Sequence, residues 1–293
     1  MPIFNFGSIN IDNFYYLPHL PQPGETLSSD RYVQQMGGKG ANQSVAAARA
    51  GSAVIHIGAV GENGGWCRDT LDAAGVDTRH VQSLTAPTGH ANIYVDRAAE
   101  NQIVLLPGAN RAMEWDAVRA AIEAATAGDI LLLQNETDHV QRAAETGRAQ
   151  GMRVIYSAAP FEPKAVQAVL PFCDLLALNQ VEADQLSQAL GVAIEDINVP
   201  AVLITRGADG AVWRDQIKDN EVSAPAFRVD PVDTTGAGDC FIGNFAAALD
   251  QGHGVKTALL KASAASAIQV TREGTSEVMP RADEVVDFLA ERL

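Results

Sequence analysis

The sequence predicts an α/β protein with a doubly wound, mostly parallel sheet flanked by helices, together with a small β-sheet lid. Apolar segments of strand length alternate with segments of helical period through most of the chain. The strand segments are nearly continuous runs of Val, Ile and Leu, as expected for parallel strands buried on both faces. Several helical segments stop at a glycine, the residue that most often caps a helix end. Alternating strands and helices form right-handed βαβ units, and these build a doubly wound sheet.

The elements of the main sheet follow one another along the chain. Strands are predicted at Ile3–Ile9, Ala53–Ala59, Asp129–Gln134, Arg153–Ser157, Asp174–Leu178 and Ala201–Thr205. Helices are predicted at Ala41–Ala50, Asp138–Gln150 and Val181–Leu190, and mostly helical structure from Gly236 to Leu293. No repeat, low-complexity tract or linker divides the chain. We therefore expect residues 1–293 to form a single domain.

Two segments show the apolar–polar alternation of a sheet with one face not covered by helices. Asn13–Leu17 and Arg31–Met36 flank the turn Pro21–Gly24, and His90–Asp96 with Gln102–Leu106 has the pattern of a hairpin. Residues 12–36 and 88–107, approximately, form either a lid over a ligand or an edge hairpin on the main sheet. The spacing favours neither alternative.

Composition excludes several classes of partner. The 293 residues carry 21 Lys and Arg against 36 Asp and Glu, a formal charge of −15, so nucleic acid and anionic membranes are poor partners. The three cysteines lie far apart without metal-ligand spacing, which suits a reducing compartment. The amino terminus lacks the pattern of a signal peptide, and no segment has the length of a membrane span. We expect a cytoplasmic protein.

The strongest motif is DTTGAGD at Asp233–Asp239, which opens a helix with an apolar stripe at four-residue spacing. At its start Gly236, Ala237 and Gly238 present free N–H groups, an anion site suited to a phosphoryl group in transfer. Asp239 follows in the first turn, where its carboxylate can accept a proton from an attacking hydroxyl. The alternative, a tight turn with Asp239 complementing the helix dipole, is weakened by the length of the motif.

A second glycine motif, GGKGANQ at Gly37–Gln43, also opens a helix. Its glycines let the backbone approach a ligand closely. Lys39 and Asn42 add a cation and an amide that can bind hydroxyl groups. The pattern of a Walker A loop is absent.

These two motifs, with GSINID at Gly7–Asp12 and PGET at Pro23–Thr26, resemble the ribokinase (pfkB-type) family of carbohydrate kinases over essentially the whole chain. The resemblance implies a ribokinase-like fold and transfer of the γ-phosphoryl group of Mg·ATP to the primary hydroxyl of a small sugar. D-ribose, giving ribose 5-phosphate, is the preferred substrate. A nucleoside kinase or a fructokinase of the same fold is the alternative, and a non-catalytic sugar-binding regulator is less favoured because Asp239 and its glycines are retained.

The resemblance also implies a role for individual residues. Asp239 would deprotonate the attacking hydroxyl beside the anion site of residues 236–238. The expected sugar-binding residues are Asn10, Asp12, Gly38, Lys39, Gly40, Ala41, Asn42 and Glu136. The expected nucleotide-binding residues are Asn179, Thr205, Arg206, Gly207, Gly210, Gly238 and Ser263. For Arg206, a solvated turn residue is the alternative.

The resemblance also implies two metal sites, one for Mg²⁺ and one for K⁺. Asn179 and Glu182 match a motif near Mg²⁺ and the phosphates, although an Asn followed three residues later by Glu also resembles a capping box, and both roles can coexist. A K⁺ activator is expected on Asp233, the Thr235 carbonyl and the loop Gln269–Gly274, which includes Arg272 and Gly274. Val278 replaces the small, often hydroxyl-bearing residue of the family, so that a side-chain oxygen is lost unless Ser276 serves in a shifted register.

The lid bears on the choice of sugar. On its second hairpin Ala91, Ile93 and Val95 share one face, and if that face covers the sugar it forms a compact roof suited to a pentose. The lid could also join two copies of the chain into a homodimer.

Overall fold

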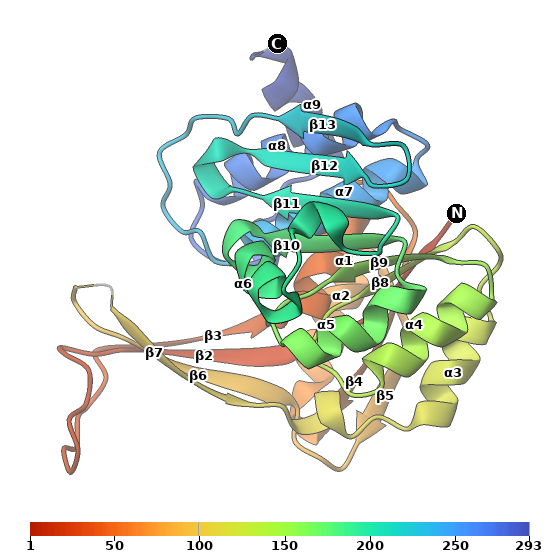
Figure 1. Cartoon of the computed structure of the whole chain (residues 1–293). Helices are drawn as coiled ribbons and strands as arrows, with labels where there is room; N and C mark the ends of the chain where they lie inside the picture. Colours follow the sequence, from red (N-terminus) through yellow and green to blue (C-terminus); the bar gives the residue numbers. More distant parts are fainter. Residues whose placement is uncertain (99, 293) are drawn as a thin grey trace.

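The computed structural model describes every residue except 99 and 293. Its main sheet has nine strands in the order β13-β12-β11-β10-β9-β8-β1-β4-β5 (Figure 1). The strands are β1 Ile3–Phe6, β4 Val54–Gly61, β5 Val76–Leu84, β8 Ile130–Leu133, β9 Arg153–Ser157, β10 Leu175–Asn179, β11 Ala201–Thr205, β12 Ala211–Asp215 and β13 Asn220–Ala224. From β5 to β11 neighbouring strands are parallel, and β12 and β13 add an antiparallel edge.

This sheet confirms the predicted fold class and contains all six predicted strands. The first strand is shorter than predicted: β1 ends at Phe6, where Gly7 packs so closely against α1 that a Cβ on Gly7 would lie 2.5 Å from the Gly40 Cα atom. Three strands were not predicted, namely β5, β12 and β13. β5 and β13 are the two edge strands and β12 lies next to β13; all three bear polar side chains among the apolar ones, so they show no continuous apolar run.

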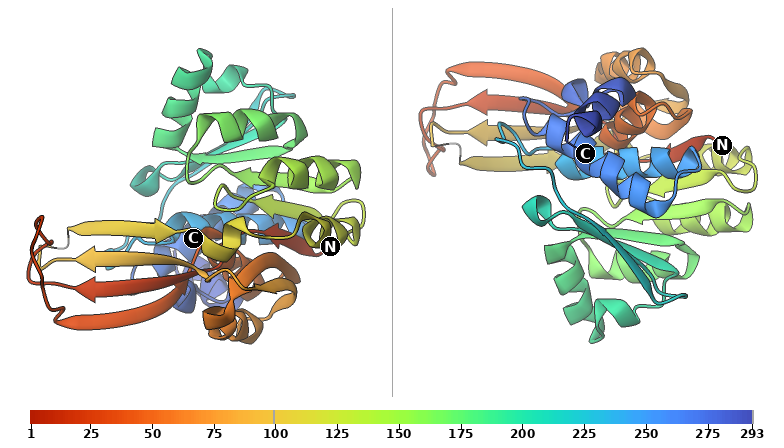
Figure 2. Two further views of the ribbon diagram at one scale, coloured as in Figure 1. Left: turned by 90° about the horizontal axis from the view of Figure 1, so that it is seen from below. Right: turned by 90° about the horizontal axis from the view of Figure 1, so that it is seen from above.

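Helices cover both faces of the main sheet (Figures 1 and 2). One face packs against α1 Lys39–Arg49, α2 Gly65–Ala73, α7 Ala237–Asp250, α8 Val255–Gln269 and α9 Ala282–Ala290. The other packs against α3 Trp115–Glu123, α4 Val140–Ala149, α5 Pro163–Val169 and α6 Gln180–Leu190. Ile3 points into the first core, and Phe4 and Phe6 into the second, which explains why the strand sequences are apolar throughout. Short 3₁₀ segments lie at Glu62–Gly64, Gly108–Arg111, Leu170–Phe172, Ile194–Asp196, Gly207–Asp209 and Ser276–Val278.

A separate four-stranded sheet, called the small sheet below, projects from one side of the molecule (Figures 1 and 2). Its order is β3-β2-β6-β7, with β2 Asn10–Tyr16, β3 Arg31–Gly37, β6 Gly89–Val95 and β7 Asn101–Leu106. The two predicted hairpins are therefore joined through the parallel pair β2–β6 and do not extend the main sheet. β2 begins within the motif Gly7–Asp12, and β3 ends at the first residue of the motif Gly37–Gln43. The small sheet is therefore anchored at these two motifs.

None of the helices in the described part of the chain is both long and apolar enough to span a membrane.

Candidate active site

The Asp239 carboxylate lies in the first turn of α7, where it is buried and held by two side chains of α1. One oxygen, Oδ2, accepts a hydrogen bond from Asn42 Nδ2 at 3.1 Å, and the other, Oδ1, accepts one from Gln43 Nε2 at 2.9 Å. The two glycine motifs, almost 200 residues apart in sequence, therefore meet at one carboxylate. Gly236 caps α7 with a left-handed φ of 75°, a conformation that suits glycine.

The predicted anion site is smaller than expected. The Ala237 N–H donates to the Thr234 carbonyl at 3.2 Å, so it is occupied by the turn and the prediction of three free N–H groups is wrong. The N–H groups of Gly236 and Gly238 have no acceptor among the described residues. Two donors at the positive end of α7 thus remain for an anion.

The predicted sugar-binding residues surround Asp239 from the side of β2 and α1. Glu136 Oε2, in the turn after β8, accepts hydrogen bonds from the Lys39 N–H at 2.8 Å and from the Ser8 hydroxyl. Asn10 is buried, and its Oδ1 accepts a hydrogen bond from Asn110 Nδ2 at 2.8 Å. The Asn42 Oδ1 atom is buried and has no partner within the described residues, so an acceptor is available.

Charges at this site are strongly coupled. Burial, together with the negative charges of Glu136 and Glu277, raises the pKa of Asp12 to about 7. The Asp239 carboxylate raises the pKa of Lys39 above its ordinary value, against the opposing effect of burial, and Glu136 and Glu182 add to the increase. Lys39 is therefore a stable cation that faces carboxylates from three separate segments.

Three of the predicted sugar-binding positions act through the backbone. Gly38 precedes α1 with a φ of +90°, which a side chain would strain. Gly40 lies against the Ser8 backbone, where a Cβ would be 2.4 Å from the nitrogen, and the Ala41 N–H donates to the Ser8 carbonyl at 2.8 Å. Together these contacts set α1 directly against Ser8, in the loop that leads into β2 at Asn10.

The predicted nucleotide-binding residues divide into two groups. Thr205, Gly207, Gly210, Gly238 and Ser263 line one cavity of about 690 Å³, together with apolar side chains such as Phe227 and Phe241. The Ser263 Oγ atom is buried there without a partner in the described part of the chain. Phe227 and the rest of the segment 226–231, which also lines this cavity, belong to no motif and were not predicted.

Asn179 and Arg206 do not line that cavity. Asn179 caps α6 in a reciprocal pair: its side chain accepts from the Glu182 N–H at 2.9 Å, while Glu182 Oε2 accepts from the Asn179 N–H at 2.8 Å. The capping box is thus present. Arg206 is exposed and its Nε donates to Gln180 Oε1 at 3.0 Å, as expected for a turn residue on the surface.

Sequence reasoning missed a chain of buried polar side chains behind Asp239. Gln43, which holds Asp239, accepts a hydrogen bond from Gln134 Nε2 at 2.7 Å, and Gln134 also donates to Asn5 at 2.9 Å. Asn5 donates to Ser44 Oγ at 2.8 Å. A signal was present, since Asn5 and Gln134 are polar residues inside apolar strand runs and Gln43 ends the second motif. Buried polar networks of this kind fix side-chain orientation.

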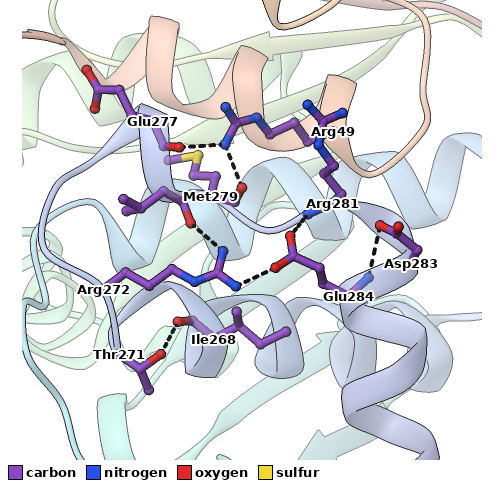
Figure 3. A network of polar contacts seen from close by, with 10 residues as sticks. Arg49, Ile268, Thr271, Arg272, Glu277, Met279, Arg281, Asp283 and Glu284 are labelled. Atoms are coloured by element: carbon purple, nitrogen blue, oxygen red, sulfur yellow. Dashed lines mark hydrogen bonds and ion pairs between the residues drawn. The ribbon is translucent and has the colours of Figure 1, made fainter.

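The residues expected to hold a monovalent cation lie together behind the start of α7. Gln269, at the end of α8, bonds through its side-chain amide to the carbonyls of Thr235 and Gly274. Arg272 donates to the Val278 carbonyl and pairs with Glu284 (Figure 3). The Ser276 hydroxyl, the alternative to the missing oxygen at Val278, donates its proton to the Met36 carbonyl at 3.3 Å.

Comparisons with known proteins agree on one family. The model of the pfkB family of carbohydrate kinases matches residues 3–282. A ribokinase of Haemophilus influenzae is 34% identical over 97% of this chain and 96% of its own, and a deoxyribokinase of Salmonella typhi is 32% identical over 99% of both. A solved structure of Arabidopsis thaliana ribokinase complexed with ribose and ATP superimposes with a TM-score of 0.87, at 29% identity over 98% of both chains.

Proposed function

The chain belongs to the pfkB family of carbohydrate kinases, and we propose that it transfers the γ-phosphoryl group of ATP to the primary hydroxyl of D-ribose. The observation that carries this proposal is the position of two adjacent residues. Gly238 lines the 690 Å³ cavity assigned to the nucleotide, and Asp239 bonds to Asn42 of the sugar motif. The start of α7 is therefore the point at which the two substrates would meet.

Each group at this point has a chemical task. Asp239 accepts the proton of the sugar hydroxyl as that oxygen attacks the phosphorus atom. The free N–H groups of Gly236 and Gly238, with the helix dipole, stabilise the negative charge of the transferring phosphoryl group. Lys39, whose raised pKa keeps it protonated, adds a positive charge on the sugar side. Positioning and electrostatics are the expected basis of catalysis in phosphoryl transfer.

We assign a Mg²⁺ site to Glu182 at the start of α6, a residue that is not itself part of the cavity lining. The described residues contain no cluster of three His, Cys, Asp or Glu side chains suited to a metal ion, and Mg²⁺ commonly relies on water, substrate phosphates and one or two carboxylates. Glu182 fits this role because only its Oε2 is used in the capping box and its charge already acts on Lys39. When bound, Mg²⁺ would neutralise charge on the ATP phosphates.

Ribose is preferred to a nucleoside because of the face that the small sheet presents. Asp12 pairs in register with Ala91, and Phe14 with Ile93, so the compact apolar side chains of β6 share the face of Asp12. Tyr15, Tyr32 and Tyr94 lie on the other face, where the rings of Tyr15 and Tyr94 stack with centroids 5.6 Å apart. The aromatic residues of β2 on the Asp12 face are Phe14 and Tyr16, and the Arg31 guanidinium covers the Tyr16 ring at 4.6 Å from its centroid, so only Phe14 is left uncovered for a base.

We expect kcat/KM to decrease from ribose to 2-deoxyribose and then to fructose or adenosine, measured by ADP release. Loss of a bonded hydroxyl leaves buried polar groups unpaired, which penalises 2-deoxyribose. If kcat/KM for 2-deoxyribose exceeded that for ribose by about tenfold or more, the chain would be a deoxyribokinase, like its relative from Salmonella typhi. An equal preference for adenosine would instead replace the proposal by a nucleoside kinase of the same fold.

We also propose that the small sheet is a lid over the sugar and that its edge joins two copies of the chain. The edge strand β7 exposes four consecutive large apolar side chains, on both of its faces: Ile103, Val104, Leu105 and Leu106 are 43–59% exposed. An apolar edge strand with free backbone groups is suited to pairing with another strand. A second copy supplies an identical strand and closes the pair by twofold symmetry.

The double variant Val104→Lys/Leu106→Lys tests the dimer. Both side chains lie on the face away from Asp12, so the charges should block pairing without entering the sugar site. In light scattering coupled to size-exclusion chromatography, we expect a dimer for the wild type and a monomer for this variant. Val286→Lys on α9, also an exposed apolar residue, is the control and should remain dimeric. A monomeric wild type would refute the proposal.

The state of the three cysteine thiols bears on the cellular compartment in which the protein works. All three cysteines, Cys67, Cys173 and Cys240, are buried and free. Burial raises the pKa of each to about 12, so they are unreactive structural residues. This supports our proposal that the protein works in the cytoplasm.

A further inference from the structure

The loop expected to hold a monovalent cation is already bridged by a side chain of the protein. Gln269 is fully buried, and its Nε2 donates to the Thr235 carbonyl at 2.7 Å and to the Gly274 carbonyl at 3.3 Å. These are two of the oxygen atoms that a cation at this position would need. An amide nitrogen carries two N–H donors, so both are used on these two carbonyls.

The third expected ligand is also satisfied from within the chain. Asp233 Oδ1 accepts the Thr235 N–H at 2.9 Å, and its Oδ2 accepts the Gly274 N–H at 3.2 Å. The carboxylate therefore ties the 235 and 274 segments together through their N–H groups, and Gln269 ties the same segments through their carbonyls. The two side chains form a closed connection behind Gly236, the residue that caps α7.

The orientation of the amide follows from its neighbours. In the reverse orientation Oε1 would lie 2.7 Å from a carbonyl oxygen with no proton between them, and the NH₂ group would lose both acceptors. An unfavourable contact between buried acceptors costs more than the hydrogen bonds contribute. The donors therefore face the carbonyls whenever no cation lies between them, although this orientation leaves Oε1 buried without a partner among the described residues.

The rest of the loop offers a cation little in exchange. Val278 supplies no oxygen from its side chain, and the Ser276 hydroxyl is bonded to Met36. The following carbonyls are held by two guanidinium groups (Figure 3): Arg272 binds that of Val278, and Arg49 binds those of Glu277 and Met279. These carbonyls are already occupied by positively charged donors of the chain. The residues present therefore do not fit K⁺.

We propose that the Gln269 side-chain amide takes the place of the monovalent cation in this chain, so that the anion site at the start of α7 is assembled without K⁺. The expectation of K⁺ activation drawn from the family resemblance is thereby reversed. Gln269, which takes the place of the cation, was itself expected to be one of the K⁺ ligands.

The first test compares KCl with tetramethylammonium chloride at equal ionic strength. For the wild type we expect the kinase activities in the two salts to agree within about twofold and the melting temperatures within about 1 °C, because neither cation binds the folded state selectively. The activity measurement rests on the proposed function, whereas the melting temperature does not. A chain that proves inactive on sugars would still report a K⁺ site through a K⁺-dependent melting temperature.

Two variants of Gln269 complete the test. Gln269→Ala opens the space and frees both carbonyls, and Gln269→Glu places a carboxylate against them, so both should acquire a dependence on K⁺ in melting temperature and activity. Gln251→Ala is the matched control, because Gln251 Nε2 also donates to a backbone carbonyl, that of Ala50, but on the surface. It should remain insensitive to K⁺.

Three results would overturn the inference. One is a wild type that K⁺ activates severalfold. Another is a wild type whose melting temperature K⁺ raises while both Gln269 variants lose that response, which would make Oε1 a ligand. The third is a pair of folded Gln269 variants that stay indifferent to K⁺. If neither variant folds, the response of the wild type alone decides.

Discussion

Asp239→Asn should lower kcat for ribose phosphorylation by roughly 10²–10⁴-fold with little change in KM, as expected for loss of general-base catalysis. Asn keeps the shape of the side chain but cannot accept the hydroxyl proton. Its oxygen can still accept one of the two hydrogen bonds that Asn42 and Gln43 donate to Asp239. Steady-state kinetics with ribose and ATP, together with ATP binding by calorimetry, separates the loss of chemistry from a loss of substrate binding.

Asp250→Asn is the matched control for this variant. Asp250 lies at the other end of the same helix, also largely buried, and pairs with the amino terminus at 3.2 Å. It should retain kcat within about twofold, because Asp250 ends α7 and its partner is the amino terminus, away from the Asn42 and Gln43 side chains that hold Asp239. An Asp239→Asn protein that keeps more than about a tenth of wild-type kcat would exclude Asp239 as the base.

Asp12→Asn should raise KM for ribose by roughly 10–100-fold, the effect of replacing a hydrogen bond to a charged acceptor. The same variant should be more stable than the wild type without substrate. Asp12 is held near Glu136 and Glu277 in a largely buried position, and its charge is costly there. The Asp12 carboxylate therefore lowers the stability of the folded protein, while it provides a charged acceptor for the sugar.

The pH dependence of this stability has a definite sign. The pKa of Asp12 is about 7 in the folded protein and 3.8 in the unfolded chain, so between these values the folded state binds more protons. Stability falls as pH rises through this window, and the penalty is complete above pH 7. Asp12→Asn removes it, and we expect a gain of about 1–3 kcal/mol at pH 8 and a smaller gain at pH 5.

Urea denaturation of the wild type and Asp12→Asn at both pH values provides the measurement. If Asp12→Asn were no more stable than the wild type at pH 8, or equally stabilised at both pH values, the Asp12 carboxylate would not be the source of the pH-dependent loss of stability. Ribose affinity of the wild type should weaken as pH falls below about 7, because protonation removes an acceptor from the site.

Much of the fold could be predicted because burial on two faces leaves an unmistakable pattern. Leu131 and Leu132 face opposite cores, so the strand β8 is apolar at every position. The strand β12, next to the edge strand β13, lacks this pattern, since Arg214 lies between Trp213 and Asp215, and it was missed. The pairing of β2 with β6 was not predictable, because these strands lie almost 80 residues apart and alternation does not specify a partner.

The site was predictable where a motif concentrates its residues and less so where they come from separate segments. Asp239 and Asn42 belong to glycine motifs, and the structure brings them together. Gln134 and Asn5 contribute single polar atoms from distant strands, so only the fold places them behind Asp239. The carbonyl ligands at Thr235 and Gly274 were expected from backbone positions alone, and a side chain, Gln269, determines what they can bind.

The identity of the phosphorylated product tests the central claim most directly. The protein is incubated with ATP and ribose, and the product is identified by ³¹P and ¹³C NMR. We predict ribose 5-phosphate as the sole sugar product, formed in equal amount to ADP, and none of it with Asp239→Asn over the same time. A phosphoryl group on another hydroxyl, ADP release without a sugar phosphate, or ribose that binds and is never phosphorylated would contradict the account.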